Sequence, residues 1–269
     1  MPQGRGRTLA PNSLIQSLGT TELRIAKPAT HEELNSLLTT WQLDLVVAIS
    51  YGRLIKPSEL ALPRYGWVNL HFSLLPKYRG AAPIQRALLA GEVKTGLTVF
   101  QLDPGMDTGP IYLQRERELV GQETTGDLLR SLAEDGSEAL LQAMTMIERG
   151  IAPSPQSDEG VSLAPKISKE EAHIDWTASA QKINRKIRAF NPIPGAWTTF
   201  RGERMILTSA RVSSQQCPPA TLLAQNNSLL IGTGEASLEI LRLKPQGKRE
   251  MEISEWLRGA RVQNGECFE

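Results

Sequence analysis

Two polar side chains in an apolar segment have the groups needed to activate a carbonyl. Asn69 and His71 lie two residues apart in the segment 67–72, which we predict to be a strand. Residues two apart on a strand project from the same face, and the carboxyl end of a parallel strand borders the crevice where open α/β sheets bind ligands. An amide and an imidazole that converge there can polarise a carbonyl and stabilise an oxyanion. The alternative is that His71 is a structural residue held by hydrogen bonds.

A loop rich in glycine and proline follows the next predicted strand and contains two carboxylates. It runs from residue 103 to 110 and includes Asp103 and Asp107. Because it lies at the same edge of the sheet as His71, a carboxylate here can orient the imidazole, raise its pKa and relay a proton. The alternative is a turn in which both carboxylates accept hydrogen bonds from backbone amides. We expect that structural behaviour for Asp103 and a catalytic role for Asp107.

The first half of the chain alternates strand and helix patterns, which is typical of an α/β domain. The near-continuous apolar run 43–49 indicates a strand covered on both faces. Thr30 has the character of a helix N-cap, with Glu33 placed to complete a capping box. The other predicted strands are 23–26, 67–72, 97–102 and 111–119, and the other predicted helices are 82–89 and 124–149.

The residue pattern changes after Gly150, where several prolines indicate a linker. Apolar residues then recur at helical spacing from Ala180 to Phe190, with lysines and arginines mostly off the apolar stripe. From about residue 196, short strand-like runs separated by turns predict a small β barrel or sandwich. We therefore predict a first domain over 1–155, a linker with a basic helix over 156–195, and a β-barrel domain over 196–269.

The amino-acid composition does not indicate which molecules the protein binds. The 30 lysines and arginines balance 29 aspartates and glutamates, so any surface that binds nucleic acid must be local. Phosphate contacts are expected from Arg5, Arg7, Lys77, Arg79 and the basic helix 182–188. The two cysteines lie far from each other and from any histidine cluster, so neither a disulfide framework nor a zinc site is predicted. No apolar run approaches the length of a membrane span, and we expect a cytoplasmic protein.

Three separated motifs resemble one enzyme family. Asn-x-His-x-Ser-Leu-Leu-Pro at 69–76, followed by Asp-Thr-Gly at 107–109, resembles the formyltransferases that use 10-formyltetrahydrofolate. The stretches 78–86, 167–176 and 188–192 are similar to the branch that acts on methionyl-tRNA. The resemblance covers essentially the whole chain, more loosely beyond residue 200.

The resemblance implies a fold and a reaction. The fold would be a doubly wound, mostly parallel, Rossmann-like sheet followed by an OB-like barrel. In the reaction, the α-amine of methionine on initiator tRNA attacks the formyl carbon of 10-formyltetrahydrofolate. Asn69 and a protonated His71 would stabilise the oxyanion, while Asp107 keeps His71 charged and helps to move the proton. A monomer without a metal is expected. The residues expected to line the folate site are Ser73, Leu74, Leu75 and Pro76.

The start of the chain departs from this pattern. Relatives begin with a strand, a Gly-Thr-Pro loop and a second strand before the arginine-rich loop in which Met1 falls here. We therefore expect an N-terminally incomplete sheet, with poor stability and activity unless an upstream segment is restored. A sugar or glycinamide N-formyltransferase would share Asn69, His71 and Asp107, and a truncated tRNA-binding relative without activity is a third alternative. The stretch 81–85 and the C-terminal β region argue against the glycinamide branch.

Overall fold

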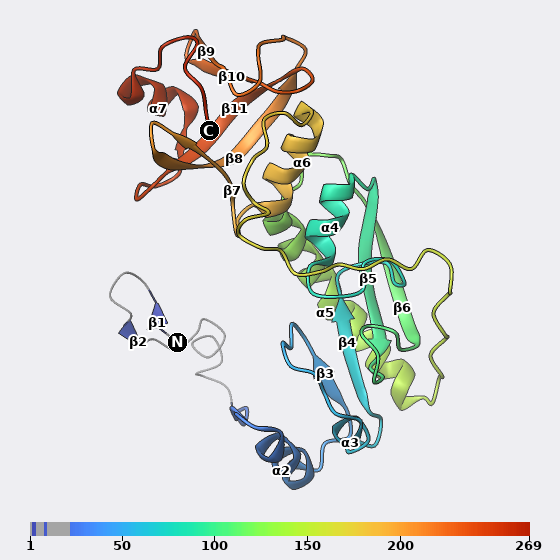
Figure 1. Cartoon of the computed structure of the whole chain (residues 1–269). Coiled ribbons are helices and arrows are strands. Elements are labelled where there is room, and N and C mark those ends of the chain that lie inside the picture. The colour runs from blue at the N-terminus through green and yellow to red at the C-terminus, as the bar shows by residue number, and fades with distance from the viewer. Residues whose placement is uncertain (1, 4–7, 10–21) are drawn as a thin grey trace. The chain divides into compact units, whose positions relative to one another are not determined.

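The computed structural model describes residues 2–3, 8–9 and 22–269, and the chain divides into two compact units, Met1–Leu43 and Asp44–Glu269 (Figure 1). Arg5 and Arg7, two of the expected phosphate contacts, lie outside the described residues. In the first unit, strands β1 (Pro2–Gln3) and β2 (Thr8–Leu9) pair antiparallel.

Helix α2 (His31–Trp41) of the first unit begins at the predicted N-cap. The Thr30 hydroxyl accepts a hydrogen bond from the Glu33 amide at 3.2 Å. The Glu33 carboxylate accepts from the amide of Ala29 rather than that of Thr30, so the expected capping box is only half formed. The predicted strand at 23–26 is wrong, because the described residues 22–29 have no regular structure and no strand pairs with them. Without such a partner the backbone has no ladder of hydrogen bonds to fix it.

The second unit begins with a four-stranded mixed sheet in the order β3-β4-β5-β6. The strands are β3 (Val46–Ala48), β4 (Trp67–His71), β5 (Lys94–Gln101) and β6 (Ile111–Glu118). Only β3 and β4 are parallel, whereas β4–β5 and β5–β6 are antiparallel. The prediction of a mostly parallel sheet is therefore wrong for the described residues. The connection after β4 does not carry the chain back to the start of that strand, so β5 begins near His71 and runs the opposite way.

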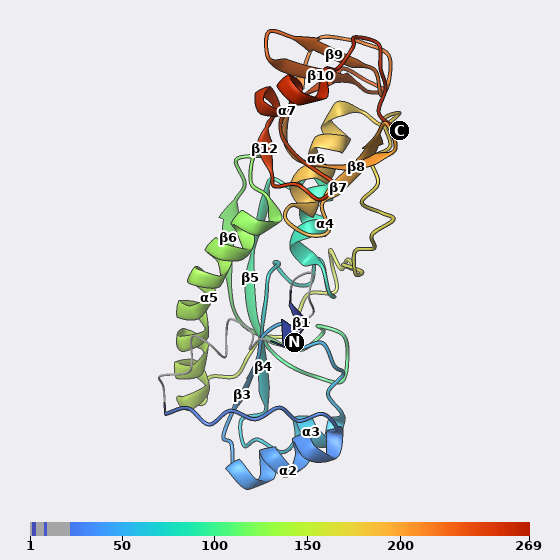
Figure 2. The same ribbon diagram turned by 90° about the vertical axis from the view of Figure 1, so that its left-hand side faces the viewer.

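One long helix, α5 (Thr125–Glu148), covers one face of this sheet, as Figure 2 shows. Thr124 and Asp127 form a capping box at its start, which supports the predicted helix boundary. A Cβ atom at Gly136 would lie 2.5 Å from Leu70 Cδ2, so a side chain there would require Leu70 to move. Leu70 thus faces α5, and its neighbours along β4 project from the opposite face.

The C-terminal strands form a second, antiparallel sheet. Its order is β7 (Ala196–Phe200), β8 (Glu203–Ser213), β11 (Ser237–Pro245), β10 (Ser228–Gly232) and β9 (Leu222–Gln225), with β12 (Met251–Glu252) beside β11. The predicted β region is confirmed. In the part of the chain that the structure describes, no pairing joins the end strands β7 and β9, so the expected closed barrel is not found. Helix α7 (Ile253–Ala260), which the sequence did not predict, packs against β10, β11 and β12.

Helix α6 (Ala180–Phe190) lies beside α4 (Pro83–Ala90) and also packs against β8 (Figure 1). Its apolar stripe is buried as predicted. The Thr125 hydroxyl donates to the Ala189 carbonyl at 2.6 Å and so ties α5 to α6. A short helix, α3 (Pro57–Leu60), precedes β4. Both sheets of this unit are thus joined through α6, and β4 carries His71 to the edge where the site lies.

Candidate active site

His71 ends β4 and is almost fully buried, with 6% of its surface exposed. Its Nε2 atom lies 2.9 Å from the backbone carbonyl of Tyr78. Since a carbonyl oxygen only accepts hydrogen bonds, this contact fixes the proton on Nε2. The edge of the ring meets Phe100, with the two centroids 6.3 Å apart. In the neutral imidazole, the free lone pair therefore lies on Nδ1.

Asp107 faces that nitrogen. Its Oδ2 atom lies 3.7 Å from His71 Nδ1, which is too long for a hydrogen bond but close enough for an ionic interaction when His71 is protonated. The same oxygen accepts a hydrogen bond from the Gly80 amide at 2.7 Å, so the carboxylate is held in place. Asp107 has a φ of 54°, a left-handed conformation that aspartate tolerates better than most residues. The structure thus brings together His71 and Asp107, which are 36 positions apart in the chain.

Asp103 behaves as the structural alternative predicted. Its carboxylate accepts hydrogen bonds from the Gly105 amide at 3.0 Å and from the Thr108 hydroxyl at 2.7 and 2.9 Å. These bonds close the turn between β5 and β6. Asp103 therefore shapes the loop that holds Asp107.

The charge state of His71 differs from the sequence-based expectation. Burial lowers the pKa of His71, and the opposing effects of the Asp107 carboxylate and the Tyr78 carbonyl are smaller. The net pKa lies below the usual value, so the resting imidazole is neutral near pH 7. Asp107 acts on the pKa of His71 in the expected direction, but burial has the larger effect. A neutral His71 can accept a proton at Nδ1.

Asn69 shares the strand face of His71, two residues earlier on β4. Its side chain is half-buried, and among the described residues its amide group has no hydrogen-bond partner. Asp107 is also partly accessible, with 16% of its side chain exposed. The site therefore offers an amide donor, a basic nitrogen and a carboxylate to a molecule that approaches from solvent.

The segment expected to line the folate site has a divided role. Ser73 and Leu75 are buried, and the Ser73 hydroxyl donates to the Lys77 carbonyl at 2.7 Å. Leu74 and Pro76 are partly exposed, and the Leu75–Pro76 peptide is cis. Leu74 and Pro76 are thus the side chains of this segment that a ligand can contact, while Ser73 and Leu75 hold the loop.

Two glutamines organise the site and were not found from the sequence. Gln114 Nε2 donates to the Leu75 carbonyl at 2.7 Å and to the Thr98 hydroxyl at 3.0 Å. Gln156 Nε2 donates to the carbonyls of Asp107 at 2.9 Å and Gly109 at 2.8 Å.

The other amide atom of Gln156, Oε1, accepts from Arg79 Nε at 3.1 Å and from its Nη2 at 2.6 Å. Gln156 thereby joins the loop of Asp107 to the segment whose Tyr78 carbonyl binds His71. It lies in a proline-containing stretch predicted as linker, where no local pattern indicated such contacts.

Several cations expected to contact phosphates are instead engaged within the protein. Arg79 binds Gln156, and Lys77 forms an ion pair with Glu92 at 3.2 Å. On the basic helix α6, Lys186, Arg185 and Arg188 donate to the carbonyls of His173, Ala90 and Glu123. These bonds tie α6 to neighbouring segments, while Lys182 of the same helix is exposed.

Neither of two cavities in the described part of the chain, of about 380 and 460 Å³, is lined by Asn69, His71 or Asp107. Within residues 2–3, 8–9 and 22–269, no group of three or more histidine, cysteine, aspartate or glutamate side chains is placed to hold a metal ion. The helices described for this chain include none that is both long and apolar enough to span a bilayer. Asn69 and Asp107 are both partly exposed, so the site can be reached from the surface.

Comparison with known proteins is consistent with this arrangement. Residues 1–144 match the formyl transferase family and residues 166–261 match the formyl transferase C-terminal domain. The methionyl-tRNA formyltransferase of Thermobifida fusca (strain YX) is 40% identical over 270 residues, which are 98% of this chain and 87% of that protein. The methionyl-tRNA formyltransferase of Salinispora tropica is 42% identical over 273 residues, 99% of this chain and 88% of that protein.

Solved structures share the fold at lower identity. HypX from Aquifex aeolicus in complex with tetrahydrofolic acid has a TM-score of 0.67 and 22% identity, over 85% of this chain and 41% of that one. Methionyl-tRNA formyltransferase from Clostridium thermocellum has a TM-score of 0.55 and 19% identity, over 71% and 82% of the two chains. Because the identity to the two curated relatives is 40% and 42% over nearly the whole chain, this protein belongs to the methionyl-tRNA formyltransferase family.

Proposed function

We propose that this protein transfers a formyl group from 10-formyltetrahydrofolate to the α-amine of methionyl initiator tRNA, for translation initiation. The observation that carries the proposal is the buried His71, whose Nδ1 faces Asp107 on the strand face that also carries Asn69. An amine acceptor must lose a proton, and its attack places negative charge on the formyl oxygen. The site has one group for each demand.

The residues divide the chemistry as follows. Bound folate supplies the formyl carbon. The Asn69 amide donates to the formyl oxygen as the amine nitrogen forms its bond to that carbon. His71 Nδ1 accepts the proton released by the amine and returns it to the departing folate nitrogen as the old carbon–nitrogen bond breaks. While charged, the imidazolium is stabilised by the Tyr78 carbonyl and by Asp107. No metal is required.

The proposal also covers the folate contacts, the domain division, the oligomeric state and the location of the protein. Leu74 and Pro76 would contact the folate, because their side chains are partly exposed beside the site, whereas Ser73 and Leu75 would hold the loop. The division into a catalytic domain (1–155), a linker with a basic helix (156–195) and a C-terminal β domain (196–269) is proposed on the positions of the two sheets. A cytoplasmic monomer suits the reaction.

The test is formyl transfer to methionyl initiator tRNA, measured with labelled formyl donor for the wild-type protein and for His71→Asn. We expect transfer by the wild type and a loss of several orders of magnitude in kcat for the variant, with folate affinity nearly unchanged, because His71 acts only during transfer. A nucleotide-linked amino sugar serves as the competing acceptor. Faster transfer to the amino sugar than to methionyl-tRNA would show that the proposed acceptor is wrong. Equal rates for the wild type and His71→Asn would refute the proposed site.

A further inference from the structure

The chain between α5 and α6 binds the loop that supports the two proposed catalytic groups. Figure 1 shows this part of the chain, drawn in yellow, crossing beside the carboxyl end of β4. Leu163 forms a parallel bridge with Arg79, and backbone hydrogen bonds on either side of it join residues 162–164 to residues 76–82. A stretch that the sequence predicts to be a linker therefore forms part of the framework of the site.

Ser162 uses all three of its polar groups on this loop. Its hydroxyl accepts a hydrogen bond from the Tyr78 amide at 2.9 Å, across 84 positions of the chain. Its carbonyl accepts from the Arg79 amide at 2.9 Å, and its own amide donates to the Pro76 carbonyl at 3.3 Å. One residue thereby holds both peptide groups that flank the Cα atom of Tyr78.

The geometry of the peptide group explains what these bonds do to the imidazole. In a trans peptide the N–H and the C=O lie in one plane and point in opposite directions. Because the Ser162 carbonyl binds the Arg79 amide, the Tyr78 carbonyl of the same peptide group points away from Ser162. That carbonyl lies 2.9 Å from His71 Nε2. The imidazole is thus held by a peptide group whose opposite end is bound by Ser162.

The backbone of Tyr78 has a conformation that needs such support. Its φ is 61°, in the left-handed region that bulky residues rarely adopt. A residue in that region keeps its conformation only when the surrounding structure holds it there. The Ser162 hydroxyl fixes the peptide group before the Tyr78 Cα atom. Without this hydroxyl that peptide group is free to turn, and the carbonyl that follows it loses part of its fixed direction.

The same segment also fixes the backbone group that binds Asp107. Gly80 donates its amide to Asp107 Oδ2 at 2.7 Å and has a φ of 121°. A Cβ atom at Gly80 would lie 2.8 Å from the Ala164 carbonyl oxygen, so glycine allows the two backbones to approach this closely. The Ala164 amide donates to the Arg79 carbonyl at 2.6 Å. Residues 162–164 thus support both members of the proposed catalytic pair.

We propose that Ser162 is a positioning residue of the active site, whose hydroxyl keeps the Tyr78 carbonyl on His71 Nε2 and so leaves Nδ1 as the nitrogen that accepts the proton. Its effect on formyl transfer rests on the proposed function, whereas the position of the imidazole proton does not depend on it. Ser162 acts through the backbone of Tyr78. Its removal should therefore change the direction and the tautomer of the imidazole without removing a group that contacts the substrate.

The first experiment measures formyl transfer to methionyl-tRNA by the wild type, Ser162→Ala and Ser162→Thr. Alanine removes the hydroxyl but keeps both backbone bonds of residue 162, so the fold is retained. We expect kcat to fall roughly 10-fold, below the loss of about 100-fold that a displacement of about 1 Å can cause, because the Ala164 pairing remains. KM for both substrates should change less than about threefold. Ser162→Thr keeps the hydroxyl, and its kcat should lie within about twofold of the wild-type value.

The second experiment observes the imidazole directly, whatever the acceptor of the reaction. The chain has 3 histidines, so ¹⁵N-histidine labelling gives a simple NMR spectrum, in which the His71 signals are those absent from His71→Asn. Above about pH 7 the wild type should show a protonated Nε2 and an unprotonated Nδ1. In Ser162→Ala the two signals should move towards each other, because the proton then exchanges between the two nitrogens. Ser162→Thr should keep the wild-type spectrum.

Ser157→Ala is the matched control, because it also removes a serine hydroxyl that accepts a backbone amide in this part of the chain, that of Glu159 at 3.0 Å. It should keep the wild-type kcat and spectrum, and thermal unfolding midpoints verify that every variant is folded. A wild-type kcat or a wild-type tautomer in Ser162→Ala would overturn the proposal, as would an equal loss in Ser162→Thr or in the control. Wild-type protein that transfers no formyl group would instead refute the proposed function, and the NMR spectra alone would then decide whether Ser162 positions the imidazole.

Discussion

Replacing Gln156 should separate the positioning of the active site from its chemistry. Gln156→Leu keeps similar bulk but removes two hydrogen bonds to the carbonyls of Asp107 and Gly109 and two from Arg79. Neutral hydrogen bonds contribute about 0.5–1.5 kcal/mol each and those to charged groups about 1.5–3 kcal/mol. Because the residues are only partly buried, the freed groups regain water, and we expect a loss of about 2–4 kcal/mol in unfolding free energy.

The effect on catalysis follows from the left-handed conformation of Asp107. With φ at 54°, this residue depends on its surroundings to hold its backbone, and Gln156 binds its carbonyl directly. A displacement of about 1 Å at a catalytic group can cost on the order of 100-fold in rate. We expect kcat for formyl transfer to fall about 10- to 100-fold, with KM for both substrates changed less than about threefold.

The assay is single-turnover formyl transfer at saturating substrates, together with urea unfolding of the same proteins. Gln156→Glu keeps an acceptor for Arg79 but loses the donor to the two carbonyls, so it should lose activity like Gln156→Leu while unfolding at higher urea. Gln142→Leu, on the exposed side of α5, is the matched control and should behave as wild type. Unchanged kcat in Gln156→Leu, or full activity in Gln156→Glu, would refute the reasoning about the Asp107 loop.

The remaining predictions concern the residues around the imidazole. Asp107→Asn should reduce kcat by several orders of magnitude, whereas Asp103→Asn should reduce it less, because Asp103 only closes the turn; equal losses would show that the loop is misassigned. Burial lowers the pKa of His71. The folded protein should therefore keep its full stability above the unfolded pKa of about 6.5, and its unfolding free energy should decrease as the pH falls towards the folded pKa. Urea unfolding between pH 5 and 7.5 should show wild type losing stability relative to His71→Asn as pH falls, and parallel curves would contradict the assigned direction.

Local patterns in the sequence indicated the parts of the site that depend on neighbouring residues. The spacing of Asn69 and His71 correctly placed both on one face of a strand, because alternation is a property of the extended backbone itself. The N-cap at Thr30 and the turn at Asp103 followed from side chains that bind backbone atoms only a few residues away. The family resemblance added the chemistry to these positions.

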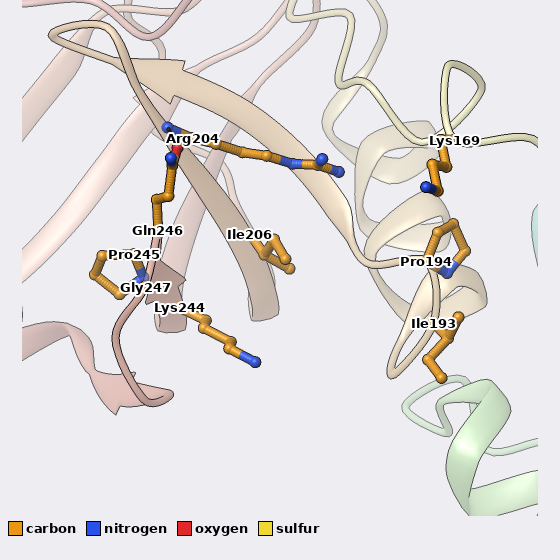
Figure 3. A pocket seen from close by; sticks show the side chains of 9 residues that line it. All are labelled: Lys169, Ile193, Pro194, Arg204, Ile206, Lys244, Pro245, Gln246 and Gly247. Atoms are coloured by element: carbon orange, nitrogen blue, oxygen red, sulfur yellow. Dashed lines mark hydrogen bonds between the residues drawn. The ribbon is translucent and has the colours of Figure 1, made fainter. Parts of the chain in front are cut away.

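Tertiary structure decided the features that depend on segments far apart in the chain. The direction of β5 follows from how the connection after β4 packs, which no periodicity records. Gln156 reaches a loop 49 residues earlier in the chain, and its stretch reads as a linker. Lys169, Arg204 and Lys244 line one cavity although they come from the segment before α6, from β8 and from β11 (Figure 3), so no pattern along the sequence indicates that they lie together.

The charge state of His71 likewise depends in part on features visible in the sequence and in part on the tertiary structure. The sequence correctly indicated a carboxylate beside the imidazole, which acts to raise its pKa. The depth of burial belongs to the folded chain alone, since it comes from the residues packed around the ring and from its place at the end of a covered strand. Desolvation outweighs the carboxylate at 3.7 Å, and the histidine is therefore neutral at rest.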